Sequence, residues 1–275
     1  MPSPFYLFIH IPKTAGTTLR SILDLQYGRK NVLTYYNQTS AQLLENLNAT
    51  LKVGRHGYRA LIGHFPYGPH DKLETPSKYV TILRDPVTRA ISSYYENAKS
   101  GSPAVRRDNG EVMDLRECIE NKQQFFANQQ LKMLIGKNTM DVLDNADLQT
   151  ASDNFARDFL FTGISEYFDA SILLLSKRLG WRPCIYGRLN TGVAQTGIEN
   201  RVLESLKELN QLEIELYEER RELLLRKMRR EGRRFDSALG QLVAASSAAF
   251  KKFGGASGAT EITGKGNALK SYLGG

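Results

Sequence analysis

Residues 5–19 (FYLFIHIPKTAGTTL) constrain the fold of this chain more than any other stretch. The uncharged apolar run at residues 5–9 predicts a buried strand, which stops at Pro12. Residues 13–18 (KTAGTT) then form a loop of small residues. The apolar side chains that follow have nearly helical spacing: Leu19, Ile22, Leu23 and Leu25. The sequence therefore predicts a strand, a small-residue loop and a helix in succession.

This loop has the composition of an anion-binding turn. A strand-loop-helix unit directs backbone N–H groups and the positive end of the helix at an anion. Gly16 allows a close approach of the backbone, the threonine hydroxyls can donate hydrogen bonds, and Lys13 adds a mobile positive charge. In the standard nucleotide P-loop the lysine comes late and follows a glycine, so this loop is of another kind. An ordinary turn with capping threonines is the alternative, and Lys13 favours the anion site.

Further apolar runs indicate a parallel sheet. Residues 58–65 form a second run with a histidine at its C-terminal end, and residues 79–83 form a third, followed at once by Arg84-Asp85-Pro86. Pro86 suits the first position of a helix. Residues 160–164 resemble a fourth strand. Strands separated by helices predict an α/β fold: a P-loop-like, three-layer arrangement with a central, mostly parallel sheet flanked by helices, and a long C-terminal helix.

Three polar side chains follow directly from the ends of these predicted strands: Lys13, His64 and Arg84. Ligands of parallel sheets bind beyond the carboxyl ends of the strands, so neighbouring strands would bring the three side chains to one edge. Ser92 lies about two helical turns after Arg84, where a guanidinium and a hydroxyl can hold a second phosphate. Taken alone, this pair is better explained by a local ion pair of Arg84 and a tolerated helical serine.

Helices and loops are also predicted outside these strands. The expected helices are residues 40–51, 115–135, 144–158 and 168–179, and residues 31–36 are a possible short strand. The expected loops are residues 100–110 and 188–192.

Composition narrows the class of protein. With 41% hydrophobic and 24% charged residues the chain is typical of globular proteins. No apolar run approaches the roughly 20 residues that span a bilayer, and no signal-peptide pattern is present, so we expect a cytoplasmic location. The two cysteines are far apart and the four histidines lack metal-ligand spacing, which argues against a disulfide framework or a metal site.

The net charge of +8 is concentrated in one segment. Residues 220–234 contain eight basic and two acidic side chains, a net +6, which leaves +2 for the rest of the chain. This indicates a basic helix end rather than a nucleic-acid-binding protein. Residues 198–231 read as a long helix whose leucines can pack on the core or join a second copy in a homodimer; their irregular spacing does not favour the dimer. The predicted division is 1–197, a catalytic domain; 198–234, the basic helix; and 235–275, a loosely ordered tail.

Two segments resemble the signatures of a known family. HIPKTAGTTL followed by ILRDPVTRAISSYY resembles the sulfotransferases that use 3′-phosphoadenosine 5′-phosphosulfate (PAPS), in particular the carbohydrate enzymes of the heparan sulfate 2-O/6-O type and their bacterial relatives. Residues 128–131 and 164–181 are also similar to segments of that family. The resemblance covers roughly residues 5–192 and leaves out the basic helix and the tail.

The resemblance implies a donor and a set of site residues. The 5′-phosphosulfate would bind to Lys13, Thr14, Ala15, Gly16, Thr17 and Thr18, and the 3′-phosphate to Arg84 and Ser92. Lys13 would neutralise the leaving oxygen, and His64 would take the proton of the acceptor hydroxyl, a role that suits a pKa near 6.5. His70 is the rival base, and some family members use a carboxylate, for which Asp71 or Glu74 are candidates. No metal is implied, because the loop already supplies positive charge.

The expected function is therefore sulfuryl transfer from PAPS to an acceptor hydroxyl, with a saccharide favoured by the resemblance alone. One alternative is a P-loop-like kinase using ATP, since residues 80–85 form an apolar strand ending in Asp85; the displaced lysine and Pro86 argue against it. Another is a non-catalytic scaffold whose basic helix binds polyanions. A degenerate transferase that binds the nucleotide without turnover also fits. The sequence leaves the acceptor open, because acceptor choice depends on loops such as residues 65–76 and 100–110.

Overall fold

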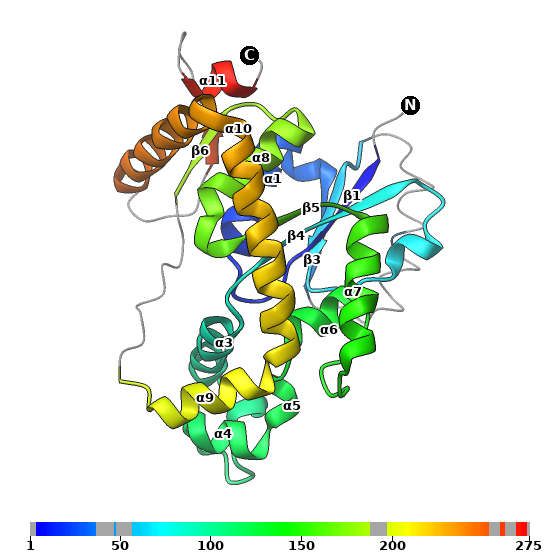
Figure 1. The fold of residues 1–275 in the computed structure, drawn as a ribbon, viewed down its shortest axis with the longest axis vertical. Helices are drawn as coiled ribbons and strands as arrows, with labels where there is room; N and C mark the ends of the chain where they lie inside the picture. Colours follow the sequence, from blue (N-terminus) through cyan, green and yellow to red (C-terminus); the bar gives the residue numbers. More distant parts are fainter. Residues whose placement is uncertain are drawn as a thin grey trace.

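The computed structural model of the chain describes residues 4–36, 47, 57–187, 197–252, 259–261 and 268–273. A five-stranded sheet lies at its centre and helices surround it (Figure 1). The strands are β1 (Phe5–Ile9), β2 (Val32–Tyr35), β3 (Ala60–Gly63), β4 (Ser77–Leu83) and β5 (Phe159–Ile164). They are all parallel, in the order β2-β3-β1-β4-β5. The predicted parallel α/β fold is confirmed.

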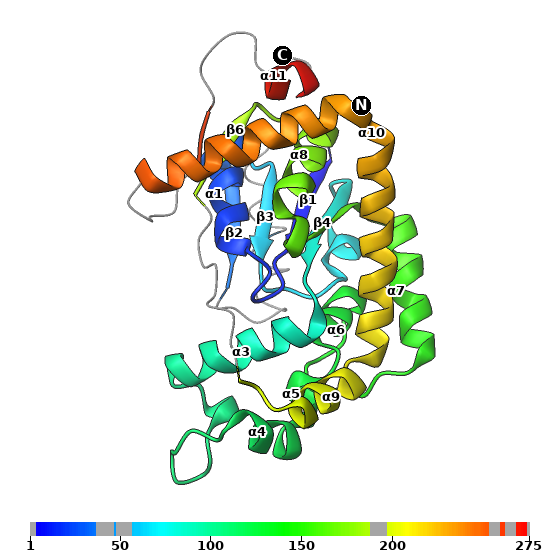
Figure 2. The same cartoon turned by 60° about the vertical axis from the view of Figure 1, so that its left-hand side comes forward.

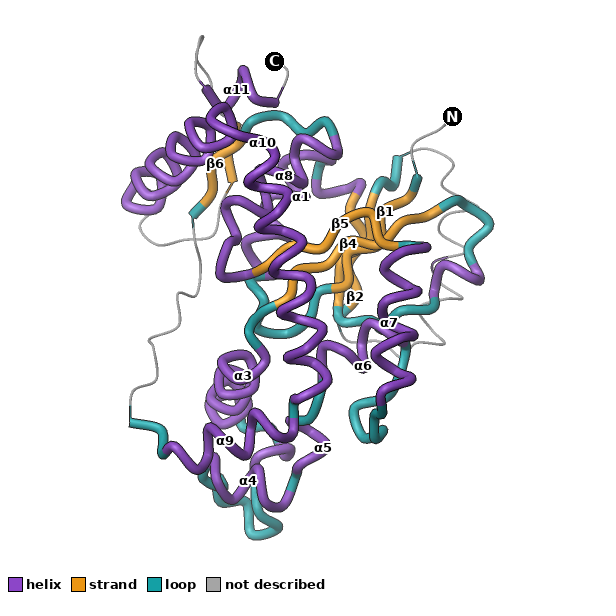
Figure 3. Tube along the Cα trace, viewed as in Figure 1, coloured by secondary structure: helices purple, strands orange, loops and turns teal. Residues whose placement is uncertain are grey.

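The described helices connect and cover these strands (Figure 3). They are α1 (Gly16–Tyr27), α3 (Pro86–Ser100), α4 (Leu115–Asn121), α5 (Gln123–Phe126), α6 (Gln129–Ile135), α7 (Asn145–Arg157), α8 (Phe168–Leu179), α9 (Asn200–Leu209), α10 (Gln211–Lys252) and α11 (Ala268–Leu273). Short 3₁₀ turns are η1 (Arg29–Asn31), η2 (Pro69–Lys72), η3 (Pro103–Val105) and η4 (Ser165–Tyr167). A separate antiparallel pair joins β6 (Cys184–Tyr186) to β7 (Ala259–Glu261). None of the described helices is long and apolar enough to cross a membrane.

Several helix ends follow the expected local chemistry. Helix α3 has Pro86 at its first turn, and the Asp85 side chain accepts a hydrogen bond from the backbone N–H of Thr88. Asp144 and Asp147 form a capping box at the start of α7. Helix α8 ends at Gly180, whose φ of 62° is left-handed. Because these signals are local, the sequence is sufficient to place such boundaries.

Two long predicted helices are interrupted. The helix expected over residues 115–135 is three helices, α4 to α6, and the one expected from residue 198 is broken at Asn210 between α9 and α10. At each break an asparagine side chain accepts a hydrogen bond from the backbone at the other break. The backbone N–H of Asn128 donates to Oδ1 of Asn210, and the backbone N–H of Glu213 donates to Oδ1 of Asn128. Asn128 adopts a left-handed φ of 51°, which asparagine tolerates.

Helix α10 extends beyond the expected boundary. It turns at Gly232, where φ is 68°, and continues to Lys252 across the end of the molecule (Figure 2). The sequence predicts a loosely ordered tail from residue 235, whereas Phe235, Ala238 and Leu242 are buried in the main core. Their spacing of three and four residues forms one apolar stripe on the helix, which is sufficient to hold this small-residue segment on the core. Apart from Leu47, which is helical and buried, the predicted helix 40–51 lies outside the described residues, as does the loop 188–192.

The core has two parts. The larger cluster of buried side chains surrounds the sheet, and a smaller one lies among α3, α4, α5 and α9. Helix α3 leaves the end of β4 and runs into the smaller cluster (Figure 2). The carboxyl edge of the sheet therefore faces the junction between the two clusters.

Candidate functional site

Three neighbouring strands end at one edge of the sheet. In the register of β3, β1 and β4, Ile9 pairs with Gly63 on one side and with Thr81 on the other. His64 follows β3 directly, Arg84 follows β4 directly, and Lys13 lies in the turn after β1. The structure thus brings these three predicted site residues to one edge; their chemical roles stay predictions.

The turn after β1 has an unusual backbone. Lys13 and Ala15 have φ values of 72° and 68°, in the left-handed region that non-glycine residues rarely adopt. The hydroxyl of Thr14 donates to the carbonyl oxygen of Ile11 at 2.8 Å, so this side chain points inward rather than toward a ligand. Helix α1 starts without a side-chain cap, which leaves its first N–H groups suited to an anion.

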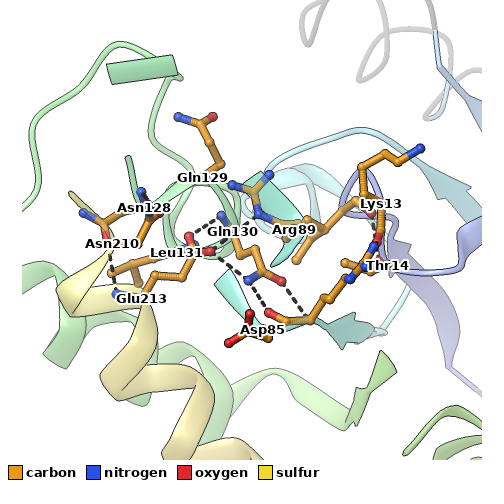
Figure 4. A network of polar contacts seen from close by, with 12 residues as sticks. Lys13, Thr14, Asp85, Arg89, Asn128, Gln129, Gln130, Leu131, Asn210 and Glu213 are labelled. Carbon is orange, nitrogen blue, oxygen red and sulfur yellow. Dashed lines mark hydrogen bonds and ion pairs between the residues drawn. The ribbon is translucent and has the colours of Figure 1, made fainter. Parts of the chain in front are cut away.

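Arg84 joins the two segments of the site. Its Nη1 donates to the carbonyl oxygen of Lys13 at 3.0 Å. Its backbone N–H donates to Oε1 of Gln130 at 3.0 Å, and its backbone carbonyl accepts from Nε2 of Gln130 at 2.8 Å (Figure 4). Among the described residues, no other atom of the Arg84 guanidinium has a hydrogen-bond partner, so several of its donors remain for a ligand.

Helix α3 closes the other side of the turn. Nζ of Lys13 lies 3.2 Å from Oε2 of Glu96. Ser92 precedes Glu96 by four residues, and residues at this spacing share a helix face. Ser92 therefore lies on the face of α3 that approaches Lys13.

The rings of His10, Tyr36 and His64 form a cluster at the carboxyl ends of β1, β2 and β3. Nδ1 of His10 is 3.2 Å from the hydroxyl of Tyr36, and the ring centroids of His10 and His64 are 4.7 Å apart. Burial, with a contribution from nearby His64, lowers the pKa of His10 to about 3. Loss of hydration on partial burial also lowers the pKa of His64, although the residue keeps some exposure to solvent. Both imidazoles are therefore neutral at pH 7, and a neutral His64 can accept a proton.

Gly16 allows His10 to lie directly against the turn. A Cβ atom at position 16 would be 1.7 Å from Nε2 of His10, which is inside the ring's van der Waals radius. The ring of His10 thus connects His64 on one side with the start of α1 on the other. Glycine is required at this position by contact and not by backbone angle.

The alternative bases lie elsewhere. Nδ1 of His70 is 2.9 Å from the hydroxyl of Tyr79, and its Nε2 is 3.4 Å from Oδ2 of Asp158 and 3.2 Å from Oδ1 of Asp71. Asp158 directly precedes β5, so this group is toward the amino ends of the strands. Glu74 is exposed in the segment that leads to the start of β4. Of the proposed bases, His64 is the one at the carboxyl edge.

Sequence reasoning did not identify three residues of this site. Gln130 contacts the backbone of Arg84, Glu213 contacts Gln130, and Glu166 accepts a hydrogen bond from the backbone N–H of Asp85. For Gln130 the available signal was the similarity of residues 128–131 to a family segment. Residues 164–181, which include Glu166, carried the same kind of similarity, whereas Glu213 has no local pattern that distinguishes it from other helical glutamates.

The match to a family model covers all the site residues named above. The family model described as galactose-3-O-sulfotransferase matches residues 1–247. This range contains the turn at residues 13–18, His64, Arg84, Ser92 and the first part of α10.

The individual relatives have low sequence identity to the chain. Heparan-sulfate 6-O-sulfotransferases 1-A and 1-B of Danio rerio are each 24% identical to the chain, over 77% and 79% of its length. The matches cover 63% and 65% of those proteins, so the chain spans less than two thirds of either. A crystal structure of a sulfotransferase from Alicyclobacillus acidocaldarius has 16% identity and a TM-score of 0.46, covering 79% of this chain and 95% of that one.

Proposed function

Because this chain belongs to the galactose-3-O-sulfotransferase family, we propose that it transfers a sulfuryl group from PAPS to a hydroxyl group of a saccharide. The donor, the acceptor and the residue roles are our proposal. The observation that carries it is the hydrogen bond from Nη1 of Arg84 to the carbonyl oxygen of Lys13. This contact supports two adjoining anion sites, as required by a nucleotide with phosphates on both its 3′ and 5′ oxygens.

The residues at this edge fit such a donor. Residues 13–18 offer an uncapped helix N-terminus and the amine of Lys13 to the 5′-phosphosulfate. Arg84 and Ser92, from the end of β4 and from α3, offer N–H and O–H donors to the 3′-phosphate. The His10 ring packs directly against Gly16 in this turn.

The proposed chemistry is an in-line transfer. The donor supplies an activated sulfur: the bond from sulfur to the bridging oxygen of the 5′-phosphate breaks as the acceptor oxygen bonds to sulfur. Lys13 stabilises the negative charge that develops on this bridging oxygen. His64, neutral because its pKa is lowered, takes the proton from the acceptor hydroxyl. The turn and Arg84 hold the donor in line with the acceptor. Binding therefore meets part of the entropic cost of reaching the transition state.

A saccharide acceptor is proposed from the comparisons alone. The names of the family and of the relatives specify galactose and heparan sulfate for those proteins. A direct test incubates the purified chain with ³⁵S-labelled PAPS and, separately, galactose-terminated oligosaccharides and desulfated heparan sulfate. We expect label on one of these acceptors with the wild type and none with Lys13→Ala. A wild type that binds neither PAPS nor its product 3′-phosphoadenosine 5′-phosphate (PAP) would refute the proposal.

A further inference from the structure

A buried carboxylate of the C-terminal helix is connected to the proposed donor site. The side chain of Glu213 is 1% exposed and lies near the start of α10. Its Oε2 accepts hydrogen bonds from the backbone N–H groups of Gln130 at 2.6 Å and Leu131 at 3.2 Å, and its Oε1 accepts from Nε2 of Gln130 at 2.7 Å (Figure 4). Glu213 therefore binds both the first turn of α6 and the side chain of Gln130.

The contacts with Glu213 and with Arg84 agree on one orientation of the Gln130 amide. An ionised carboxylate only accepts hydrogen bonds, so Nε2 of Gln130 must face Glu213. The same Nε2 donates to the carbonyl oxygen of Arg84, and Oε1 accepts from the backbone N–H of Arg84. The side-chain amide thus pairs with both backbone groups of Arg84, as a neighbouring strand would beyond the end of β4.

A buried arginine lies beside this carboxylate. Nε of Arg89, 3% exposed, lies 3.6 Å from Oε1 of Glu213. Neither Nε nor Nη2 of Arg89 has a hydrogen-bond partner within the described part of the chain, so its charge is compensated mainly through Glu213. Arg89 and Glu213 thus form a buried pair of opposite charge directly beside Gln130.

We infer that Gln130 and Glu213 are positioning residues for the 3′-phosphate of the donor, acting through the backbone of Arg84. This inference rests on the proposed function and deepens it. Arg84 carries its position on to Lys13 through the bond from Nη1 to the Lys13 carbonyl oxygen. A residue near the start of α10 thereby sets the geometry of the two anion sites without touching the donor.

The junction between α6 and α10 also has contacts that do not involve the side chain of Gln130 or of Glu213. Asn210 accepts from the backbone N–H of Asn128, and Asn128 donates from its side chain to the carbonyl oxygen of Leu209. Asn210 is fully buried and contacts neither Gln130 nor Arg84 in any described hydrogen bond. The two sets meet where the backbone N–H of Glu213 donates to Oδ1 of Asn128. Loss of the Asn210 side chain nevertheless removes none of the side-chain hydrogen bonds of Gln130 and Glu213, which allows positioning to be separated from general stability.

The experiment compares the dissociation constants of PAP and adenosine 5′-phosphate, which lacks the 3′-phosphate, by isothermal titration calorimetry. Gln130→Met removes both hydrogen bonds to Arg84 without adding charge, and Glu213→Gln weakens the acceptor that holds Nε2 of Gln130 and the first turn of α6. We expect the preference for PAP to fall about tenfold in Gln130→Met and by a smaller factor in Glu213→Gln. The control Asn210→Ala disturbs the same junction, and should lower the melting temperature while the preference for PAP is retained.

Three results overturn the inference. An unchanged preference for PAP in a folded Gln130→Met protein removes the positioning role. An equal fall in Asn210→Ala shows that the effect is one of general stability. A wild type without any preference for PAP removes the proposed function itself, and with it this inference.

Discussion

Nη1 of Arg84 and the carbonyl oxygen of Lys13 are joined by a hydrogen bond of 3.0 Å, although the residues are 71 positions apart. The bond ties the corner after β4 to a turn whose backbone at Lys13 is left-handed. A strained conformation persists only where its surroundings hold it, and Arg84 is one of those surroundings. The two segments therefore act as one site, and substitutions in either should be felt in the other.

Arg84 is expected to distinguish nucleotides by their 3′-phosphate. Arg84→Lys keeps the charge and loses the planar set of donors, so binding of PAP should weaken about tenfold or more. Binding of adenosine 5′-phosphate should change much less. Equal losses for the two nucleotides in titration calorimetry would contradict a 3′-phosphate contact.

Substitutions of Lys13 and of Glu96 should have opposite effects on the proposed donor site. Lys13→Ala is expected to abolish transfer of ³⁵S from PAPS while the melting temperature is kept. Glu96→Gln removes the partner of the Lys13 ammonium, so PAP should bind more tightly, by no more than about fivefold because the Glu96 side chain is 58% exposed. Near-normal turnover of Lys13→Ala would exclude this residue from the mechanism.

His64 is expected to affect the chemical step and not donor affinity. Loss of a general base typically costs about 100- to 10,000-fold, so His64→Ala should reduce kcat on this scale with the PAP dissociation constant unchanged. The matched variant His70→Ala removes the histidine beside Asp158 and should retain turnover. The reverse result, an active His64→Ala and an inactive His70→Ala, would transfer the role to His70.

The stability of the protein should fall in acid because of His10. The pKa of His10 is about 3 in the folded protein and near 6.5 when unfolded, so the unfolded chain binds the extra proton. The neutral ring is therefore fully stabilising above pH 6.5, and this contribution is lost progressively as the pH falls from 6.5 toward 3. The slope from this residue is at most about 1.4 kcal/mol per pH unit.

Urea unfolding between pH 7.5 and pH 4.5 measures this effect. His10→Asn should flatten the curve relative to the wild type, with part of the slope left from His64, whose pKa is lowered too. Identical slopes in the two proteins would show that His10 is not buried in its neutral form.

Gly16→Ala should disrupt the site by contact with His10. The added methyl group would meet the imidazole at 1.7 Å, and overpacking of this kind typically costs about 1–3 kcal/mol. PAP affinity should fall as well, and the double variant His10→Ala/Gly16→Ala should recover part of the stability. Gly240→Ala is the control, since a Cβ on Gly240 in α10 meets nothing within 4 Å and alanine favours a helix. Equal stability of Gly16→Ala and Gly240→Ala would contradict this contact.

The sequence was sufficient for the parts of the fold that depend on local pattern. The strands around residues 5–9 and 79–83 are continuous apolar runs, and Pro86 and Gly180 mark helix ends. The ends of the apolar runs were sufficient to predict that Lys13, His64 and Arg84 lie at one edge of the sheet. Contacts across the chain were not predictable: Gln130 and Glu213 are 83 residues apart, and glutamates are common on exposed helix faces. The breaks at Asn128 and Asn210 were missed because each asparagine is tolerated in a helix and becomes a cap only through the other. The long extent of α10 was missed because its second half has few large apolar side chains.

The contact between Glu213 and Gln130 also bears on how the chain matures during synthesis. A nascent chain released as far as residue 197 already contains both signature segments and all five strands of the sheet. The carboxylate that contacts the Gln130 amide is made later, so by our inference the proposed donor site would reach its final geometry only after the start of α10 has left the ribosome. A truncated gene product ending before this helix would keep every signature residue and still lack a finished pocket.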